Sequence, residues 1–240
     1  MKLLLKLKYL PLLVSLVCSS FSAELRFAKI FTDHAVLQRD ISVPVWGWAE
    51  PEVEVTVEFS GQKKKTTTDK TGKWMIRLDP MVANPKGQQL KVTAVGSSVI
   101  LKDILVGEVW LASGQSNMGF SICKSTHAEE ARKLIPHPTL RRFKVGSYIA
   151  TKPLVDIGED GAFQHPHWRM GDVGKWRTVD NERHGLDWIS AVAAWFGHEV
   201  RISQGVPVGI IESHFGGSKL YCWMPRESLE NSPEFTRDII

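Results

Sequence analysis

The sequence predicts an α/β domain that follows a small all-β sandwich. Apolar and polar residues alternate with a period of two up to about residue 104, which is typical of strands with one buried face. Beyond Gly107, unbroken apolar runs are separated by helical patterns, and this order is typical of α/β domains. We therefore place the β-sandwich at residues 23–104 and the α/β domain at residues 105–240.

The β-sandwich prediction depends on three alternating segments joined by turns. Their apolar members are Val53, Val55, Val57 and Phe59, then Trp74, Ile76 and Leu78, and then Leu90, Val92 and Ala94. Trp46 and Trp48 lie in register on another strand, and we interpret them as core residues, with a sugar-stacking platform as the alternative. The run Lys63 to Lys65 is interpreted as the solvated edge of a hairpin.

The α/β prediction depends on two buried strands and two helices. The apolar runs 109–112 and 206–211 predict strands that are apolar on both faces, as in a covered parallel sheet. Residues 128–135 predict a short helix. Residues 189–203 carry an amphipathic stripe, formed by Ile189, Val192, Ala193, Phe196 and Val200. Gly205 and Pro207 are expected to end that helix.

The first 22 residues are typical of a signal peptide. A start with lysines precedes an apolar stretch at residues 10–17 and small residues at Ser20 and Ser22. We therefore expect an exported protein, periplasmic or extracellular, without a stable membrane anchor, because the apolar stretch is too short to span a bilayer. Its oligomeric state is left open.

The charge of the mature chain gives no reason to expect nucleic acid or an anionic membrane surface as a partner. The formal net charge is +4, but Lys2, Lys6 and Lys8 lie in the predicted signal peptide. Removing these three from the 30 Lys and Arg leaves 27, against 26 Asp and Glu. A nearly neutral chain lacks the basic surface that binding to phosphates requires.

Two cysteines could form a disulfide, and two histidines could bind a metal. Cys123 and Cys222 are the mature cysteines, and two small buried hydrophobic residues are preferred over a disulfide. His165 and His167 invite a metal interpretation, which we do not favour because no convergent third ligand is identified. They lie in an irregular region, residues 156–183, that we assign mostly to loops.

Two polar turns follow the buried strands and form the candidate site. The first contains Gln115, Ser116 and Asn117, and the second contains Gly216 and Gly217. Ligands collect beyond the carboxyl ends of strands in open α/β sheets. A serine in such a turn can attack an acyl group while backbone N–H groups hold the oxyanion. The turn is not an α/β-hydrolase nucleophile elbow, which would place glycine where Met118 stands.

Residues 107–118, GEVWLASGQSNM, resemble the first signature block of the sialate O-acetylesterase family, within the SGNH-type serine esterases. Residues 206–218, VPVGIIESHFGGS, resemble its second block, and residues 36–39 and 43–48 are similar to its N-terminal β-domain. The resemblance implies an SGNH-hydrolase-like domain with a flavodoxin-like three-layer fold. It also implies a secreted carboxylic ester hydrolase that removes O-acetyl groups from sugars, without a metal or an organic cofactor.

Carried onto this sequence, the resemblance makes Ser116 the nucleophile. The backbone N–H of Ser116 and of a glycine in the 216–217 pair would form the oxyanion hole, with Gly217 preferred over Gly216 and the choice left open. Acetylated sialic acid and acetylated plant polysaccharide are the kinds of substrate implied.

The sequence departs from the family in its general base. No Asp precedes a His by three residues, and Asp180 with His184 is the nearest case. We therefore expect a fragment whose α/β domain is incomplete at its C-terminus and which is nearly inactive alone. His184, His198 and His214 are weak candidates for a substitute base. The alternative function is a non-catalytic exported carbohydrate-binding module with a degenerate hydrolase half.

Overall fold

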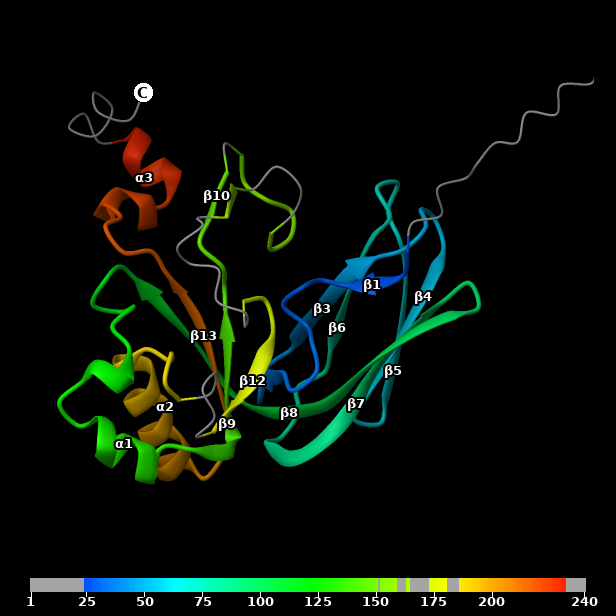
Figure 1. The fold of residues 1–240 in the computed structure, drawn as a ribbon. Coiled ribbons are helices and arrows are strands. Elements are labelled where there is room, and N and C mark those ends of the chain that lie inside the picture. Colours follow the sequence, from blue (N-terminus) through cyan, green and yellow to red (C-terminus); the bar gives the residue numbers. More distant parts are fainter. Residues whose placement is uncertain (1–23, 151, 159–162, 165–172, 181–185, 232–240) are drawn as a thin grey trace, which may run out of the picture.

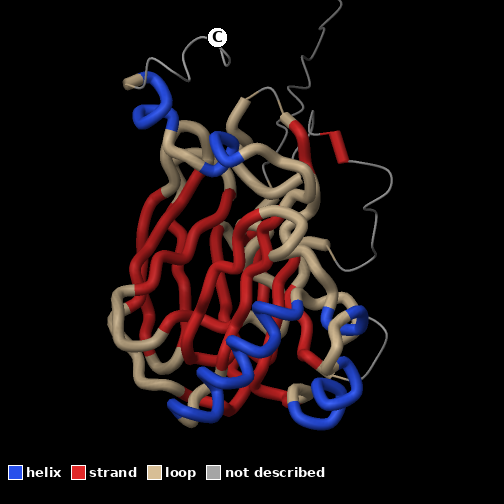
Figure 2. The backbone as a smooth tube through the Cα atoms, turned by 90° about the vertical axis from the view of Figure 1, so that its left-hand side faces the viewer, coloured by secondary structure: helices blue, strands red, loops and turns tan. Residues whose placement is uncertain are grey.

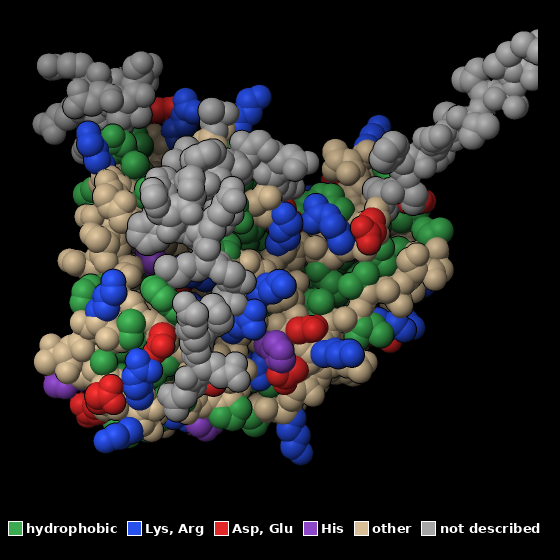
Figure 3. All heavy atoms as spheres, in the orientation of Figure 1, with side chains coloured by type: hydrophobic (Ala, Val, Ile, Leu, Met, Phe, Trp, Pro, Cys, Tyr) green, Lys and Arg blue, Asp and Glu red, His purple; other side chains and the backbone are tan. Residues whose placement is uncertain are grey.

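The computed structural model describes residues 24–150, 152–158, 163–164, 173–180 and 186–231 (Figure 1). The predicted signal peptide therefore lies outside the described residues. None of the helices in those ranges is both long enough and apolar enough to cross a membrane. Basic and acidic side chains are interspersed on the face shown in Figure 3.

The larger of the sheets is mixed and has the strand order β12-β9-β13-β8-β7-β4-β5, with β2 beside β8. Its strands are β2 (Val36–Gln38), β4 (Glu54–Phe59), β5 (Gln62–Thr67), β7 (Asn84–Ala94), β8 (Ser97–Gly114), β9 (His137–Lys144), β12 (Trp176–Val179) and β13 (Val208–His214). A smaller antiparallel sheet, in the order β1-β3-β6, contains β1 (Arg26–Phe27), β3 (Val43–Trp48) and β6 (Lys73–Leu78). Strands β10 (Tyr148–Ile149) and β11 (Phe163–Gln164) form a separate pair.

One hydrophobic core lies between the smaller sheet and the antiparallel part of the larger sheet. Val45 of β3 and Leu78 of β6 contribute from one side, and Val57 of β4 and Leu90 of β7 from the other, all fully buried. The alternation with a period of two produces this arrangement because it places each strand's apolar residues on one face. Lys63 to Lys65 lie in β5, the outermost strand of the sheet, as the sequence predicted.

Strand β8 joins the two parts of the molecule. Its first half pairs antiparallel with β7, and its second half, Glu108 to Gly114, pairs parallel with β13. Figure 1 shows the strand running from the antiparallel region into the region covered by helices. The domain boundary expected between residues 104 and 105 thus lies inside one continuous strand.

Five helical segments complete the described fold. They are η1 (Ile122–Lys124), α1 (Ala128–Leu134), α2 (Ala191–Gln204), η3 (Leu220–Trp223) and α3 (Arg226–Glu230). The longest, α2, lies across one face of the larger sheet (Figure 2). A Cβ on Gly197 would lie 3.0 Å from Leu140 Cδ1 and 3.2 Å from Ile210 Cδ1, so a glycine permits the close packing of α2 on β9 and β13.

The ends of α2 agree with the sequence prediction. Ser190 is the N-cap, and its side chain accepts a hydrogen bond from the Ala193 N–H, at 3.2 Å. Gly205 follows the helix with a φ of +66°, a conformation that glycine adopts without a steric penalty.

Two expectations about burial are wrong. The 109–112 segment is not covered on both faces, because Trp110 and Leu111 are 42% and 65% exposed. This part of β8 pairs with β13 along one edge. Among the described strands, none lies along the other edge of this part of β8. Cys222 is also exposed, whereas Cys123 is half-buried, and both are free thiols.

Candidate active site

The two polar turns meet at one edge of the parallel sheet. Ser213 pairs with Ser113 and His214 pairs with Gly114, and the Phe215 N–H donates to the Gly114 carbonyl, at 2.9 Å. The carboxyl ends of adjacent parallel strands necessarily lie together, which explains why turns far apart in sequence become neighbours.

The first turn presents Ser116 to solvent. Gly114 opens the turn with a φ of +142°, and the Gly119 N–H closes it by donating to the Gln115 carbonyl, at 2.9 Å. The Ser116 hydroxyl donates to Gln115 Oε1, at 3.3 Å. Ser116 is therefore accessible, as a nucleophile must be.

The second turn brings Gly216 beside Ser116. A Cβ on Gly216 would lie 3.9 Å from Ser116 Cβ, so the Gly216 backbone lies beside Ser116. Gly217 has a φ of +79° and open space around its Cα. Among the described residues, the N–H groups of Ser116, Gly216 and Gly217 make no hydrogen bond within the chain, which leaves them available to an oxyanion.

A small cavity of about 230 Å³ adjoins these turns. It is lined by Ser113, Gly114 and Gln115 from the first turn and by Ser218, Leu220 and Trp223 from the second turn and η3. The indole N–H of Trp223 donates to the Ser218 hydroxyl, at 2.8 Å. This contact fixes the Trp223 ring at the mouth of the site.

Beneath the turns, Glu212 of β13 is completely buried. Its Oε2 accepts from Arg142 Nη1, at 3.1 Å, and its Oε1 accepts from the Ser190 N–H, at 2.8 Å. His214 Nε2 lies 3.8 Å from Oε1. Glu212 therefore joins β9, β13 and the start of α2. We call Glu212, Arg142 and Ser190 the buried floor.

The environment of Glu212 keeps it ionised. Burial raises its pKa, but the nearby His214 imidazole, the charges of Arg142 and Lys144, and the Ser190 N–H lower it by more, so its pKa lies below the ordinary value of 4.5. Lys144 shows the opposite balance. Burial lowers its pKa, which the charge of Glu212 partly offsets.

Two side chains contact the first turn from below: His214, and Ser190 of the buried floor. A Cβ on Gly119 would lie 2.9 Å from His214 Nδ1, so the imidazole packs directly against Gly119. The Ser190 hydroxyl lies 3.5 Å from Met118 Sδ. The absence of a side chain at Gly119 and the flexible side chain of Met118 therefore let the first turn pack on His214 and Ser190.

The sequence interpretation missed the floor. Arg142 lies in β9 between buried residues, and Glu212 ends an apolar run, so each looked like an isolated charge. The available signal was the glutamate that directly follows the predicted buried run 206–211, because a buried charge requires a partner. No strand was predicted around Arg142, so its partner could not be named.

Of the other candidate residues, the described one, His198, lies in α2 and not at the site. His198 is buried in α2 with its ring against Trp195, and burial lowers its pKa. Its Nδ1 has no hydrogen-bond partner among the described residues. His165, His167 and His184 lie outside the described residues. In the described ranges, no three His, Cys, Asp or Glu side chains are grouped as metal ligands.

The chain is similar in sequence to sialate O-acetylesterases of mammals. The chain is 29% identical over 232 residues to sialate O-acetylesterase of Mus musculus, a match covering 91% of this chain and 41% of that protein. It is 30% identical over 220 residues to sialate O-acetylesterase of Homo sapiens, covering 85% of this chain and 40% of that protein. No family model matches the chain.

A solved structure agrees with these relatives. The crystal structure of a carbohydrate acetylesterase from Xanthomonas citri matches with a TM-score of 0.74 and 32% identity, covering 86% of this chain and 44% of that one. This chain spans about two fifths of the length of the sialate O-acetylesterases it matches. The resemblance predicted from the sequence is confirmed: this chain is similar in sequence to sialate O-acetylesterases and in fold to a carbohydrate acetylesterase.

Proposed function

We propose that this chain forms the nucleophile-bearing part of a secreted serine esterase that removes O-acetyl groups from sugars. The observation that carries the proposal is the exposed Ser116 beside the Gly216 backbone, at the joined carboxyl ends of two parallel strands. The names of the relatives support an acetylated carbohydrate as substrate. The proposed fold of this part is an SGNH-type α/β domain that follows a β-sandwich domain.

In the proposed reaction, Ser116 Oγ attacks the acetyl carbonyl carbon and loses its proton to a general base. The carbonyl oxygen becomes an oxyanion, which the N–H groups of Ser116 and of Gly216 or Gly217 hold. The bond to the sugar oxygen then breaks, that oxygen takes up the proton held by the general base to become a hydroxyl, and the acetyl group remains on Ser116. Water hydrolyses this acyl-enzyme and releases acetate.

We do not propose His214 as the general base. The Nε2 of His214 faces Glu212 and its ring packs on Gly119, while the Ser116 hydroxyl donates to Gln115. We assign His214 to the wall of the site and leave the base unassigned.

A fluorophosphonate probe tests the nucleophile directly in the protein expressed from its complete reading frame. The probe should label Ser116, identified by peptide mapping, and an O-acetylated sugar should slow the labelling. Labelling of another serine would overturn the assignment. Glycan binding without any serine labelling would instead support the non-catalytic binding module.

A further inference from the structure

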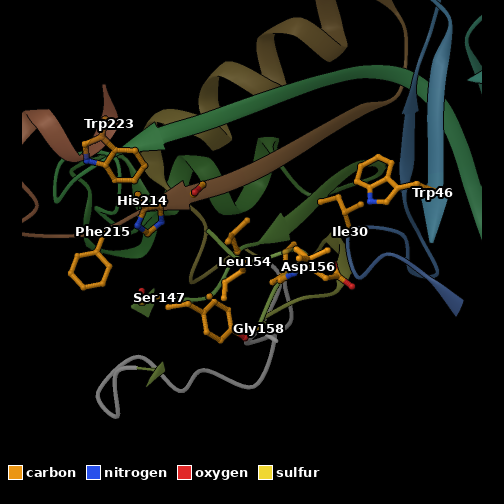
Figure 4. Close-up of a pocket in the computed structure, with 15 residues that line it drawn as sticks. Ile30, Trp46, Ser147, Leu154, Asp156, Gly158, His214, Phe215 and Trp223 are labelled. Atoms are coloured by element: carbon orange, nitrogen blue, oxygen red, sulfur yellow. Dashed lines mark hydrogen bonds between the residues drawn. The ribbon is translucent and has the colours of Figure 1, made fainter. Parts of the chain in front are cut away.

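A second, larger cavity of about 510 Å³ lies between the smaller sheet and the second turn. Figure 4 shows Ile30 and Trp46 at one end, Phe215 and Trp223 at the other, and Leu154 between them. The cavity is much larger than an acetyl group requires and falls within the size range of pockets for whole small-molecule ligands.

Trp46 faces this cavity from β3. Val43 and Val45 are buried on the core face of the strand, whereas Trp46 lies on the opposite face and is only partly buried. Its ring packs edge-to-face on Phe31, with centroids 4.8 Å apart and an interplanar angle of 79°. Trp46 is thus a fixed aromatic wall and not only a core residue.

The opposite wall is held in place by Asp156, which is 9% exposed. Its carboxylate accepts from Arg26 Nη1, at 2.7 Å, and from the Lys29 N–H, at 3.1 Å. Lys29 Nζ also donates to the Gly158 carbonyl, at 3.2 Å. The 154–158 segment is therefore attached to the smaller sheet before any ligand binds.

Tyr148 provides a further aromatic surface between these walls. A Cβ on Gly146 would lie 2.4 Å from Tyr148 Cε2, and one on Gly158 would lie 2.7 Å from its hydroxyl. Both glycines are thus required for the ring to occupy its position. The Tyr148 ring is therefore held in place by the backbone at these two glycines and does not rotate freely.

The cavity adjoins the candidate active site. Trp223 lines both this cavity and the small one beside Gly114 and Gln115. Ser213 and His214, at the end of β13, also line the larger cavity. A ligand that places an acetyl group at Ser116 therefore has this cavity beside it.

The lining combines aromatic rings with hydroxyl and backbone polar groups, which suits pyranose rings, since these present apolar C–H faces and a polar rim. Among the described lining residues there is no Lys or Arg, and Asp156 carries the carboxylate already paired with Arg26. This composition offers no cation to an acidic sugar. It favours neutral saccharide rings.

Resting on the proposed function, we infer that this cavity binds the neutral saccharide rings that adjoin the acetylated sugar. The substrate is then an acetylated oligosaccharide or polysaccharide, and the smaller sheet contributes to its recognition through Trp46.

Calorimetric titration of the protein with two probes tests this inference. An O-acetylated xylotetraose should bind at least about tenfold more tightly than 9-O-acetyl-N-acetylneuraminic acid. Trp46→Ala should reduce this ratio of affinities about tenfold, and Trp46→Phe should restore most of it. Tyr148→Ala, which changes a separate wall, should reduce the ratio as well.

Trp110→Ala is the matched control, because Trp110 is 42% exposed on β8 and does not line the cavity. It should leave both affinities unchanged, and thermal melts should show that each variant is folded. Equal affinity for the two probes, or a ratio unaffected in folded Trp46→Ala and Tyr148→Ala, would overturn the inference.

The two proposals fail separately. If Ser116 is labelled by a fluorophosphonate but the tetrasaccharide binds no more tightly than the monosaccharide, the saccharide site is wrong and the esterase stands. If binding depends on Trp46 but Ser116 is inert towards the probe, the site for sugar rings stands and the esterase is wrong.

Discussion

The buried floor and the turns above it are held in different ways. Glu212 and Arg142 have side chains that are 0% and 3% exposed and are tied to one another. Gln115, Ser116 and Asn117 are exposed, and the turn that carries them is closed by backbone hydrogen bonds. The difference teaches that the buried floor stabilises the fold while the exposed turns carry the proposed chemistry. Substitutions in the floor should therefore reduce stability, and substitutions in the turns should reduce activity.

The largest expected effect is on activity, from Ser116→Ala. Acetate release from an O-acetylated sugar should fall by at least about 10³-fold, because the nucleophile is lost. The free energy of unfolding should change by less than about 0.5 kcal/mol, because the side chain is exposed. Ser203→Ala, an exposed change on α2, is the control. Activity that survives in Ser116→Ala would remove this residue from the mechanism.

Glu212→Gln should produce the largest loss of stability. It leaves the Arg142 guanidinium buried opposite a neutral amide, and breaking a buried ion pair costs about 3–5 kcal/mol. Urea unfolding measures the loss. Glu199→Gln, an exposed change on α2, should have little effect. Equal stability of the two variants would mean that the floor does not hold β9, β13 and α2 together.

Acid should also remove the contribution of Glu212 to the stability of the wild-type protein. The pKa of Glu212 is lowered on folding, so its contribution to stability is complete above the unfolded value of about 4.5 and is lost as the pH falls through the lower folded value. The difference in stability between wild type and Glu212→Gln should therefore shrink below about pH 4.5. A difference that stays constant between pH 7 and pH 3 would contradict this assignment.

The two glycines of the second turn should differ by a smaller amount. Gly217→Ala should cost about 1 kcal/mol, because its φ of +79° disfavours a side chain. Gly216→Ala should be nearly neutral for stability, since its Cβ would make an ordinary contact with Ser116, at 3.9 Å. Chemical denaturation of both variants compares them, and the reverse order of stabilities would show that the turn is built differently.

The smallest effect is expected at a surface ion pair. Lys65 Nζ lies 2.7 Å from Glu54 Oε1, a short contact like those of the floor, but both side chains are more than half exposed. Lys65→Gln should change the free energy of unfolding by no more than about 0.5 kcal/mol. A loss as large as that of Glu212→Gln would mean that burial does not distinguish the two ion pairs.

Much of the fold follows from local patterns. The alternation in residues 53–59 and the stripe in residues 189–203 each predict an element that the structure contains, as β4 and α2. The adjacency of the two polar turns was also predictable, because each turn follows the carboxyl end of a predicted strand of the same parallel sheet. Which of the strands share β8 was not predictable, since pairing between Val36 and Leu105 or between Glu108 and Val208 leaves no local signal.

The site was predicted in part. The resemblance identified Ser116 and the two glycines, and the structure places Gly216 beside Ser116. Their catalytic roles remain proposals. The floor and the larger cavity escaped prediction because each combines residues from distant segments, such as Arg142 with Glu212, or Trp46 with Phe215.

The sharing of strand β8 has a consequence for how the chain reaches its native state. Val208 pairs with Glu108, one hundred residues earlier, so the second half of β8 must wait for a late segment after its first half can already pair with β7. Contacts this distant in sequence slow folding. During that interval the apolar stretch around Trp110 and Leu111 lacks its β13 partner and is open to other chains. Chaperone demand during biogenesis should therefore centre on this short stretch.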